Sequence, residues 1–472
     1  MNTRKYLLSA ASIVLSLTGC QAAGIASPAP DPTIVAIEAV AEPTATSSPA
    51  ETEVSDGLTI FYVDPGQTWQ AIEDVSGGNF ITQFAQTTEP LEDVSRYNLA
   101  NLPVRTARVR IGLEDWEPVN DDDDPLNFNW DAFHDDGYNH ATFELMQHLQ
   151  AQGSQLIATV WDVPDWLVSN PQKERTRFMP YDLYPEVVES IAAWLITARD
   201  SYGVDVDYVS FNEPDIGAYV SLIPAEIVTL LREAGPRFEA LDLHTRWLLA
   251  DVSNLDGSVS FARSIWRAED VRSYLGPFAV HSWDSDSDDS KFKGVRDFAA
   301  EEGLDVWISE AGWGAFLWST PEVFPTWEYA LRLANIYSRL LKMSGASRIL
   351  YWEMMGDDYP LNDGVQPYPS FEILRQFAEY LPPGTEIVAT SDNTESLLWF
   401  AARTPHGFLV NLVNPGAEPL AVRIVGVPET ALRHLSTSEG ETGADLGRVD
   451  GSEGHVELIL AGGSLNWLIA EK

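Results

Sequence analysis

Short apolar runs alternate with longer amphipathic stretches between about Leu58 and Pro382, and this alternation limits the chain to few architectures. Runs rich in Val, Ile, Leu and Tyr are typical of buried parallel strands, whereas amphipathic stretches of this length are typical of helices. Strands that alternate with helices predict a parallel sheet, and the spacing of these strands predicts an α/β fold closed into a (β/α)8 TIM barrel. The predicted strands are Ala71–Val75, Thr106–Ile111, Gln155–Trp161, Val204–Phe211, Trp247–Val252, Phe278–His281, Val306–Ser309 and Ile349–Trp352. The predicted helices are Tyr138–Gln152, Pro185–Ser201, Pro224–Ala240, Ser260–Tyr274, Lys293–Glu302 and Thr326–Met343.

The pattern changes after Pro382, where short strand-like runs follow one another with turn residues between them. Such a pattern predicts an all-β module, which we expect to be a small sandwich. We assign residues 58–382 to the barrel and residues 383–472 to the C-terminal module. Residues 58–65 have strand character and could join the module instead. The predicted strands of the module are Glu386–Thr390, Ser396–Arg403, Gly407–Val413, Ala421–Val425, His455–Leu460 and Ser464–Ile469.

The first twenty residues have the pattern of an export signal. Arg4 and Lys5 precede a short apolar stretch that ends in Leu-Thr-Gly before Cys20. The stretch is too short to span a membrane as a mature helix. It resembles the lipobox of bacterial lipoproteins, in which the cysteine becomes the lipidated N-terminus. We therefore expect lipidation at Cys20 and export to the cell surface or an outer membrane, the alternative being an ordinary secretory signal that ends near a cysteine.

Residues 21–57 are rich in Ala, Pro, Thr, Ser and Glu and show no apolar periodicity, so we expect a flexible linker. The whole chain is strongly acidic, with 29 Lys+Arg against 71 Asp+Glu and a net charge of -42. Such a surface repels nucleic acid and anionic headgroups, so membrane contact is expected only through the lipid anchor. The charge also disfavours polyanionic glycans, although it is equally compatible with a solubility or salt adaptation.

Two glutamates follow predicted strands in distinctive frames. Glu213 lies in Phe-Asn-Glu-Pro, and Glu310 lies in Trp-Ile-Ser-Glu-Ala-Gly. Barrel enzymes keep their chemistry at the C-terminal ends of the strands, and two facing carboxylates are the minimum apparatus for cutting a glycosidic bond. One carboxyl group must then be protonated and the other ionised, so their surroundings must differ. Taken alone, however, a glutamate before a proline often only begins a helix.

Several segments resemble the clan A retaining glycoside hydrolases, and most closely glycoside hydrolase family 30, over roughly residues 66–472. The segment from Gln70 to Phe80 is similar to the first-strand region of that family. Residues 108–112 resemble its second strand, and residues 159–166 resemble part of its third-strand signature. The resemblance implies that Glu213 is the acid/base and that Glu310 is the nucleophile. Families 5 and 39 of the same clan are the alternatives.

The resemblance also implies a set of substrate-binding residues. Asn212 would bond the sugar 2-hydroxyl, and Arg110 would pair with the nucleophile and keep it ionised. His281 would contact the nucleophile from the end of strand six. Each has a structural alternative, because Arg110 could be an ordinary paired arginine and His281 a satisfied core histidine. Tryptophans at strand ends offer flat faces for sugar rings but more often only pack. Those that we assign to the site are Trp161, Trp283 and Trp352.

Two acidic runs, Asp121–Asp124 and Asp284–Asp289, offer the clustered oxygen ligands that calcium prefers. Neither has the glycine and terminal glutamate spacing of a calcium loop, so we expect solvated loop charge and no metal. No cofactor is expected either. The sequence thus predicts a monomeric, surface-anchored retaining β-glycosidase that acts on extracellular β-linked glycans. The alternatives are a catalytically inactive carbohydrate-binding lipoprotein and a transglycosidase.

Overall fold

The computed structural model describes residues 53–55, 58–81, 93–356, 358–394 and 396–470. Cys20, the predicted export signal and residues 21–52 of the predicted linker lie outside the described residues, so lipidation stays a prediction. Among the helices that the structure describes, none is both long enough and apolar enough to cross a membrane.

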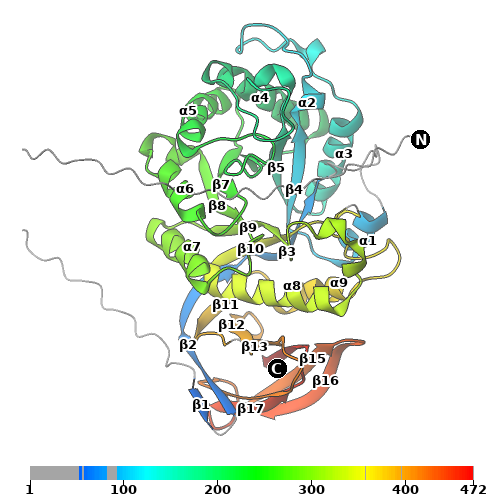
Figure 1. Ribbon diagram of the computed structural model, residues 1–472, viewed down its shortest axis with the longest axis vertical. Helices are drawn as coiled ribbons and strands as arrows, with labels where there is room; N and C mark the ends of the chain where they lie inside the picture. Colours follow the sequence, from blue (N-terminus) through cyan, green and yellow to red (C-terminus); the bar gives the residue numbers. More distant parts are fainter. Residues whose placement is uncertain (1–52, 56–57, 82–92, 357, 395, 471–472) are drawn as a thin grey trace, which may run out of the picture. The chain divides into compact units, whose positions relative to one another are not determined.

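A closed barrel of parallel strands forms the first part of the fold, which confirms the predicted architecture (Figure 1). Strand β10 pairs with both β3 and β9, and this closes the ring. The barrel strands are β3 (Asp74–Phe80), β4 (Thr106–Gly112), β5 (Gln155–Asp162), β6 (Tyr208–Phe211), β7 (Arg246–Val252), β8 (Leu275–His281), β9 (Val306–Ala311) and β10 (Ala346–Tyr351).

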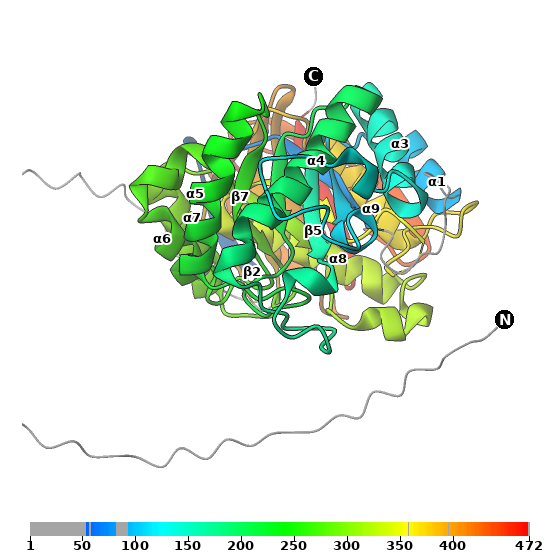
Figure 2. The same cartoon turned by 90° about the horizontal axis from the view of Figure 1, so that it is seen from above.

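The helices lie around the outside of the barrel, as Figure 2 shows from above. Two predicted helices are shorter than expected, because α6 gives way to a 3-10 turn at Glu269–Tyr274 and α8 to a π-helical turn at Leu340–Ser344. Helices α1, α2 and α9 were not predicted. The helices are α1 (Asp93–Asn101), α2 (Leu113–Trp116), α3 (Gly137–Ala151), α4 (Tyr184–Tyr202), α5 (Pro224–Ala240), α6 (Ser258–Trp266), α7 (Asp289–Glu302), α8 (Trp327–Arg339) and α9 (Pro369–Tyr380).

A layer of apolar side chains fills the barrel below the ends of its strands. Several members precede a polar residue on the same strand, as Leu248 precedes Asp251 and Ala279 precedes His281, so these polar residues have an apolar floor. The side chain of Tyr208 packs edge-on against Trp307 at a centroid distance of 5.0 Å and adds to this floor. The buried members of the layer are Ile157, Leu248, Ala279, Trp307 and Leu350.

The first barrel strand is displaced from its predicted position. The predicted run Ala71–Val75 covers the end of β2 (Leu58–Ile72) and only the beginning of β3. Strand β3 contains Gly77 and Gly78 because neighbouring side chains occupy the space beside them. A Cβ atom on Gly78 would lie 2.2 Å from Cγ of Met354, and one on Gly77 would lie 3.0 Å from Cγ of Leu350. These glycines remove the apolar signal by which a buried strand is recognised.

The β-module combines strands from both ends of the chain. Strand β2 pairs antiparallel with β11 through residues 63–72 and parallel with β14 through residues 59–62, so it connects the two halves of the sheet. Strands β15 and β16 were not predicted, and β16 is almost entirely exposed and polar. The remaining strands are β1 (Glu53–Ser55), β11 (Thr385–Thr390), β12 (Leu398–Thr404), β13 (Gly407–Asn414), β14 (Leu420–Val425), β15 (Ala431–Ser438), β16 (Glu441–Asp450), β17 (His455–Leu460) and β18 (Ser464–Ala470).

Helices α8 and α9 lie between the barrel and the β-module (Figure 1). On α8, Ser338 Oγ donates a hydrogen bond of 2.7 Å to Oδ1 of Asn411. On α9, Gln376 Nε2 donates to Oγ1 of Thr437 at 2.9 Å. All four side chains are buried, so the module is part of the same packed structure as the barrel.

The tight packing at Gly78 can be tested by adding a single methyl group. We expect Gly78→Ala to lower the free energy of unfolding by about 1–3 kcal/mol, because Met354 must leave its position in a filled core. Gly294→Ala is the matched control, since a Cβ atom there meets nothing within 4 Å on the exposed face of α7. That control should leave stability unchanged or raise it by up to about 1 kcal/mol. Equal denaturation midpoints for the two variants would contradict the packing described here.

Candidate active site

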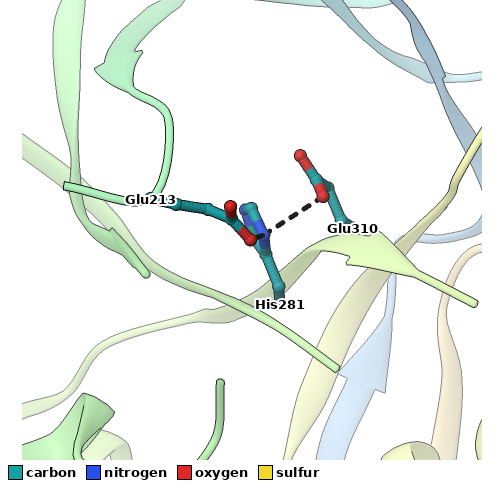
Figure 3. Close-up of side chains that lie close together, drawn as sticks. All are labelled: Glu213, His281 and Glu310. Atoms are coloured by element: carbon teal, nitrogen blue, oxygen red, sulfur yellow. Dashed lines mark hydrogen bonds and ion pairs between the residues drawn. The ribbon is translucent and has the colours of Figure 1, made fainter. Parts of the chain in front are cut away.

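Glu213 and Glu310 face each other at the C-terminal ends of the barrel strands, with the ring of His281 between them (Figure 3). Glu213 follows β6, Glu310 belongs to β9 and His281 ends β8. His281 Nδ1 lies 3.1 Å from Oε1 of Glu213 and 3.2 Å from Oε2 of Glu310. One oxygen of each carboxylate lies within 4.8 Å of the other. The two carboxyl groups are thus close together, and retaining glycosidases likewise have carboxyl groups about 5 Å apart.

The backbone at this end of the barrel is strained. Glu213 has φ +45°, and Asp251, the last residue but one of β7, has φ +53°, a region that residues other than glycine seldom adopt. The two residues are joined, because the Glu213 amide donates to the Asp251 carbonyl at 3.2 Å. Such strain persists only where the surrounding structure fixes it, and it concentrates at functional sites.

A buried arginine holds the nucleophile candidate, but it is Arg108 and not the predicted Arg110. Nη1 of Arg108 donates to Oε1 of Glu310 at 2.7 Å, and Nη2 donates to Oδ2 of Asp251 at 3.0 Å. Arg110 instead forms an ion pair with Asp162. Side chains alternate along a strand, so those of residues 108 and 110 point to the same face of β4. The sequence pattern therefore could not show which of the two arginines reaches Glu310. A role for Arg110 in substrate binding stays a prediction.

Two asparagines complete the environment of Arg108. Nη1 also donates to Oδ1 of Asn79 on β3 at 3.0 Å, and Nη2 donates to Oδ1 of Asn212 at 2.7 Å. These bonds fix the side-chain orientation of Asn212, whose buried Nδ2 then has no hydrogen-bond partner among the described residues. An immobilised amide donor beside Glu213 is chemically suited to a ligand hydroxyl, and the role of Asn212 in substrate binding stays a prediction.

Asp251 is a central member of the site that the sequence analysis missed. It is fully buried and lies 3.3 Å from Nε2 of His281 through Oδ1. Ser309 Oγ donates to Oδ1 at 2.5 Å, and Ser210 Oγ donates to Oδ2 at 2.6 Å. Burial opposes ionisation of Asp251, but Arg108 and these donors outweigh it and hold the pKa below its ordinary value. An acidic residue inside the apolar run of β7 was the signal that could have revealed it.

The charges around the two glutamates push their pKa values apart. Burial alone would raise the pKa of Glu310, but His281 and Arg108 outweigh it and hold the pKa below its ordinary value. Burial and the charge of Glu310 raise the pKa of Glu213, although His281 opposes them. Burial also opposes protonation of His281, yet the surrounding carboxylates hold its pKa well above the ordinary value. The two pKa values are thus shifted in opposite directions, Glu310 towards the ionised form and Glu213 towards the protonated form.

The predicted tryptophans surround this pair, and they also contact one another. Trp283 Nε1 donates to Oε2 of Glu310 at 3.0 Å, which adds a further bond to the ionised carboxylate. The rings of Trp161 and Trp352 stack at a centroid distance of 5.5 Å, and Tyr219 packs edge-on against Trp161. Both stacked tryptophans are buried. Their contact with a sugar ring stays a prediction.

Two groups of side chains among the described residues come close enough to share a metal ion. One consists of Glu213, His281 and Glu310. In that group Arg108 already supplies a fixed positive charge to Glu310, and the raised pKa of His281 supplies a second one. The charge of the carboxylates is thus balanced without a cation. The other group lies outside this site, beside the first acidic run.

No protein-family model matches the sequence, and no curated protein matches it. Solved structures match the fold. Xyn30A from Clostridium acetobutylicum, a glycoside hydrolase family 30 subfamily 8 xylanase, has a TM-score of 0.68 at 14% identity, over 86% of this chain and 98% of that chain. The catalytic domain of the family 30 xylanase C from Talaromyces cellulolyticus has a TM-score of 0.68 at 16% identity, over 88% and 100%.

A family 39 β-xylosidase from Caulobacter crescentus has a TM-score of 0.56 at 13% identity, over 87% of this chain and 100% of that chain. All of these similarities extend over both the barrel and most of the β-module. At such identities they concern the fold. The chain therefore has the fold of the family 30 glycoside hydrolases and of related clan A glycosidases, which confirms the resemblance seen in its sequence.

Proposed function

We propose that this protein is a retaining β-glycoside hydrolase. The observation that carries the proposal is the pair Glu213 and Glu310, which lie within reach of one histidine and have pKa values shifted in opposite directions. A fold shared with xylanases and a β-xylosidase supports the same conclusion. A binding protein needs neither the close spacing of two buried carboxylates nor their opposite protonation.

In the first step, Glu310 attacks the anomeric carbon while Glu213 transfers its proton to the departing glycosidic oxygen. This breaks the glycosidic bond and leaves the sugar as an ester of Glu310. Glu213 is then ionised and takes a proton from a water molecule, whose oxygen attacks the anomeric carbon and releases the sugar. Glu310 returns to the carboxylate, so the configuration is retained after two inversions.

The change of role at Glu213 follows from the charges around it. The negative charge of Glu310 contributes to the raised pKa of Glu213 in the free enzyme. Formation of the ester removes that charge, so the pKa of Glu213 falls when a base is needed. Hydrogen bonds to Asp251 and Glu310 keep the His281 ring between the two carboxylates, which makes His281 a positioning residue.

We further propose a neutral or weakly charged β-linked glycan as the substrate. The net charge of -42 opposes the approach of a highly anionic polymer. The proposed lipid anchor at Cys20 would hold the enzyme outside the cytoplasm, where such glycans are met. Two alternatives are a carbohydrate-binding protein without turnover and a transglycosidase, which differs only in the acceptor that reaches the Glu310 ester.

The first test uses aryl β-glycosides and neutral β-glycans with wild type, Glu310→Gln and Glu213→Gln. We expect Glu310→Gln to abolish turnover, and Glu213→Gln to lower it by about 10²–10⁴-fold, least for substrates with good leaving groups. Azide should rescue Glu310→Gly with a glycosyl azide of inverted configuration and Glu213→Gly with one of retained configuration. Binding without turnover, equal in wild type and variants, would refute the hydrolase and favour the binding protein.

The pH dependence of kcat/KM should be bell-shaped, because activity requires ionised Glu310 and protonated Glu213. The lowered pKa of Glu310 sets the acid limb and the raised pKa of Glu213 sets the basic limb. In Glu213→Gln the basic limb should disappear for a dinitrophenyl glycoside, whose leaving group needs no proton. A basic limb that persists in this variant would assign the acid to another residue.

The position of Arg108 predicts how a substitution there changes the pH dependence of kcat/KM. In Arg108→Lys the nucleophile loses the hydrogen bond from Nη1 of a fixed guanidinium group. The pKa of Glu310 should therefore rise and the acid limb of kcat/KM should move up by about 1 pH unit. Arg110→Lys is the matched control on the same face of β4, and it should leave the acid limb in place whatever it does to KM. An acid limb that moves only in the Arg110 variant would restore the assignment made from sequence.

A further inference from the structure

The two acidic runs of the sequence have different surroundings in the structure. In the second run, Asp284 has partners in the neighbouring loop after β7, since it accepts hydrogen bonds from the amides of Leu255 at 2.8 Å and Asp256 at 3.0 Å. Asp289 of the same run pairs with Arg339. The first run instead lies against two glutamates of α4, and the negative charge there has no such compensation.

We name the four carboxylates at this place the acidic cluster: Glu117, Asp121, Glu186 and Glu189. Oxygens of Asp121, Glu186 and Glu189 lie within 4.8 Å of one another. Glu117 adjoins them, because its Oε1 accepts the Asp121 amide at 3.2 Å. Glu186 and Glu189 are three residues apart and therefore occupy the same face of α4, where like charges repel.

Three members of the acidic cluster are buried. The exposed fraction is 1% for Glu117, 8% for Glu186 and 1% for Glu189. Among the ion pairs of the described residues, none involves any of the four carboxylates. Burial and the neighbouring carboxylates raise the pKa of Glu189 to about 9. Buried carboxylates that repel one another require either protons or a cation between them.

Unpartnered oxygens distinguish this place from an ordinary acidic surface. Glu186 Oε2 and Glu189 Oε1 are buried oxygens without a hydrogen-bond partner among the described residues. The side-chain oxygen of Asn120, next to Asp121 in the chain, is also without one. Asp121 by contrast is held in place, since its Oδ1 accepts the Asp122 amide at 2.7 Å and its Oδ2 the Asn129 amide at 2.8 Å. Asp121 is thus held in place, with one of its oxygens within 4.8 Å of an oxygen of Glu186 and of an oxygen of Glu189.

We propose that the acidic cluster is a binding site for one Ca²⁺ ion. Calcium takes 6–8 oxygen ligands in flexible geometry, which suits several carboxylates and an amide oxygen on a loop and a helix. Magnesium requires near-ideal octahedral geometry and keeps its waters, and the cluster has none of the nitrogen or sulfur ligands that zinc prefers. The ion joins the loop after β4 to α4. It also steadies the active-site rim, because the Glu117 carbonyl accepts a hydrogen bond of 2.9 Å from Trp166 in the next loop.

The test is calorimetric titration of the chelator-treated full chain with Ca²⁺ and, separately, with Mg²⁺. We expect one Ca²⁺ site with a dissociation constant of about 1 mM or tighter, weaker binding of Mg²⁺, and a Tm that rises by about 2 °C or more in 10 mM CaCl₂. Sodium chloride at equal ionic strength is the control for screening of the net charge. The absence of both a heat of binding and a shift in Tm would overturn the proposal. It would mean that bound protons alone neutralise the cluster.

Substitutions of single carboxylates test whether Ca²⁺ binds at the acidic cluster. Glu189→Gln and Glu186→Gln are isosteric and remove one ligand charge each, so both should fold and weaken Ca²⁺ binding by at least 10-fold. Asp123→Asn is the matched control, because it removes the same charge from an exposed side chain of the same loop. Equal weakening in all three would mean diffuse attraction to an acidic surface and would refute the site. These measurements require no turnover, so their outcome is independent of the proposed glycosidase activity.

Discussion

The arrangement of the site depends on the guanidinium group of Arg108 and its hydrogen bonds. Its hydrogen bonds reach side chains from β3, β7 and β9 and from the residue after β6, so one rigid, planar group orients residues from widely separated parts of the chain. A fully buried charge of this kind is costly unless its acceptors are in place, and the acceptors are costly without it. The geometry of Glu310, Asp251 and Asn212 is therefore fixed jointly rather than residue by residue.

The difference between the two glutamates arises from this arrangement and not from the glutamates themselves. Glu310 accepts hydrogen bonds from Arg108 and from Trp283 on one side of the histidine ring. Glu213 lies on the other side, where the ion pair that the described residues give it is with His281 and where 14% of its side chain is exposed. Two chemically identical side chains can thus hold opposite protonation states within one small site.

The sequence predicted the parts of the fold and site that have a local signature. Glu213 and Glu310 were identifiable because each follows a buried strand in a distinctive frame, and the barrel because its strands and helices alternate. Asp251 was missed because it lies within an apolar strand and not at its end. The choice of Arg110 over Arg108 failed because alternation gives the face of a residue but not its depth.

Other misses have equally physical causes. Strand β3 was displaced because Gly77 and Gly78 give up side chains to admit Leu350 and Met354, so the strand has little apolar signal. Strand β16 was missed because it is rich in charged residues and glycine and is largely exposed, so it has little apolar signal. The acidic cluster could not be predicted from the spacing of one run, since half of its carboxylates come from a helix more than sixty residues farther along the chain.

The dual pairing of β2 has a consequence for how this chain becomes a folded protein. Because β2 precedes the barrel while its partners β11 and β14 follow it, the barrel is topologically an insertion into the β-module. During synthesis β2 emerges with only β1 to pair with, and its partners β11 and β14 follow once the whole barrel has been made. A cut after residue 382 would leave this strand without β11 and β14, with its hydrogen-bonding groups exposed. The boundary between the two parts in the sequence is therefore not a boundary of the sheet.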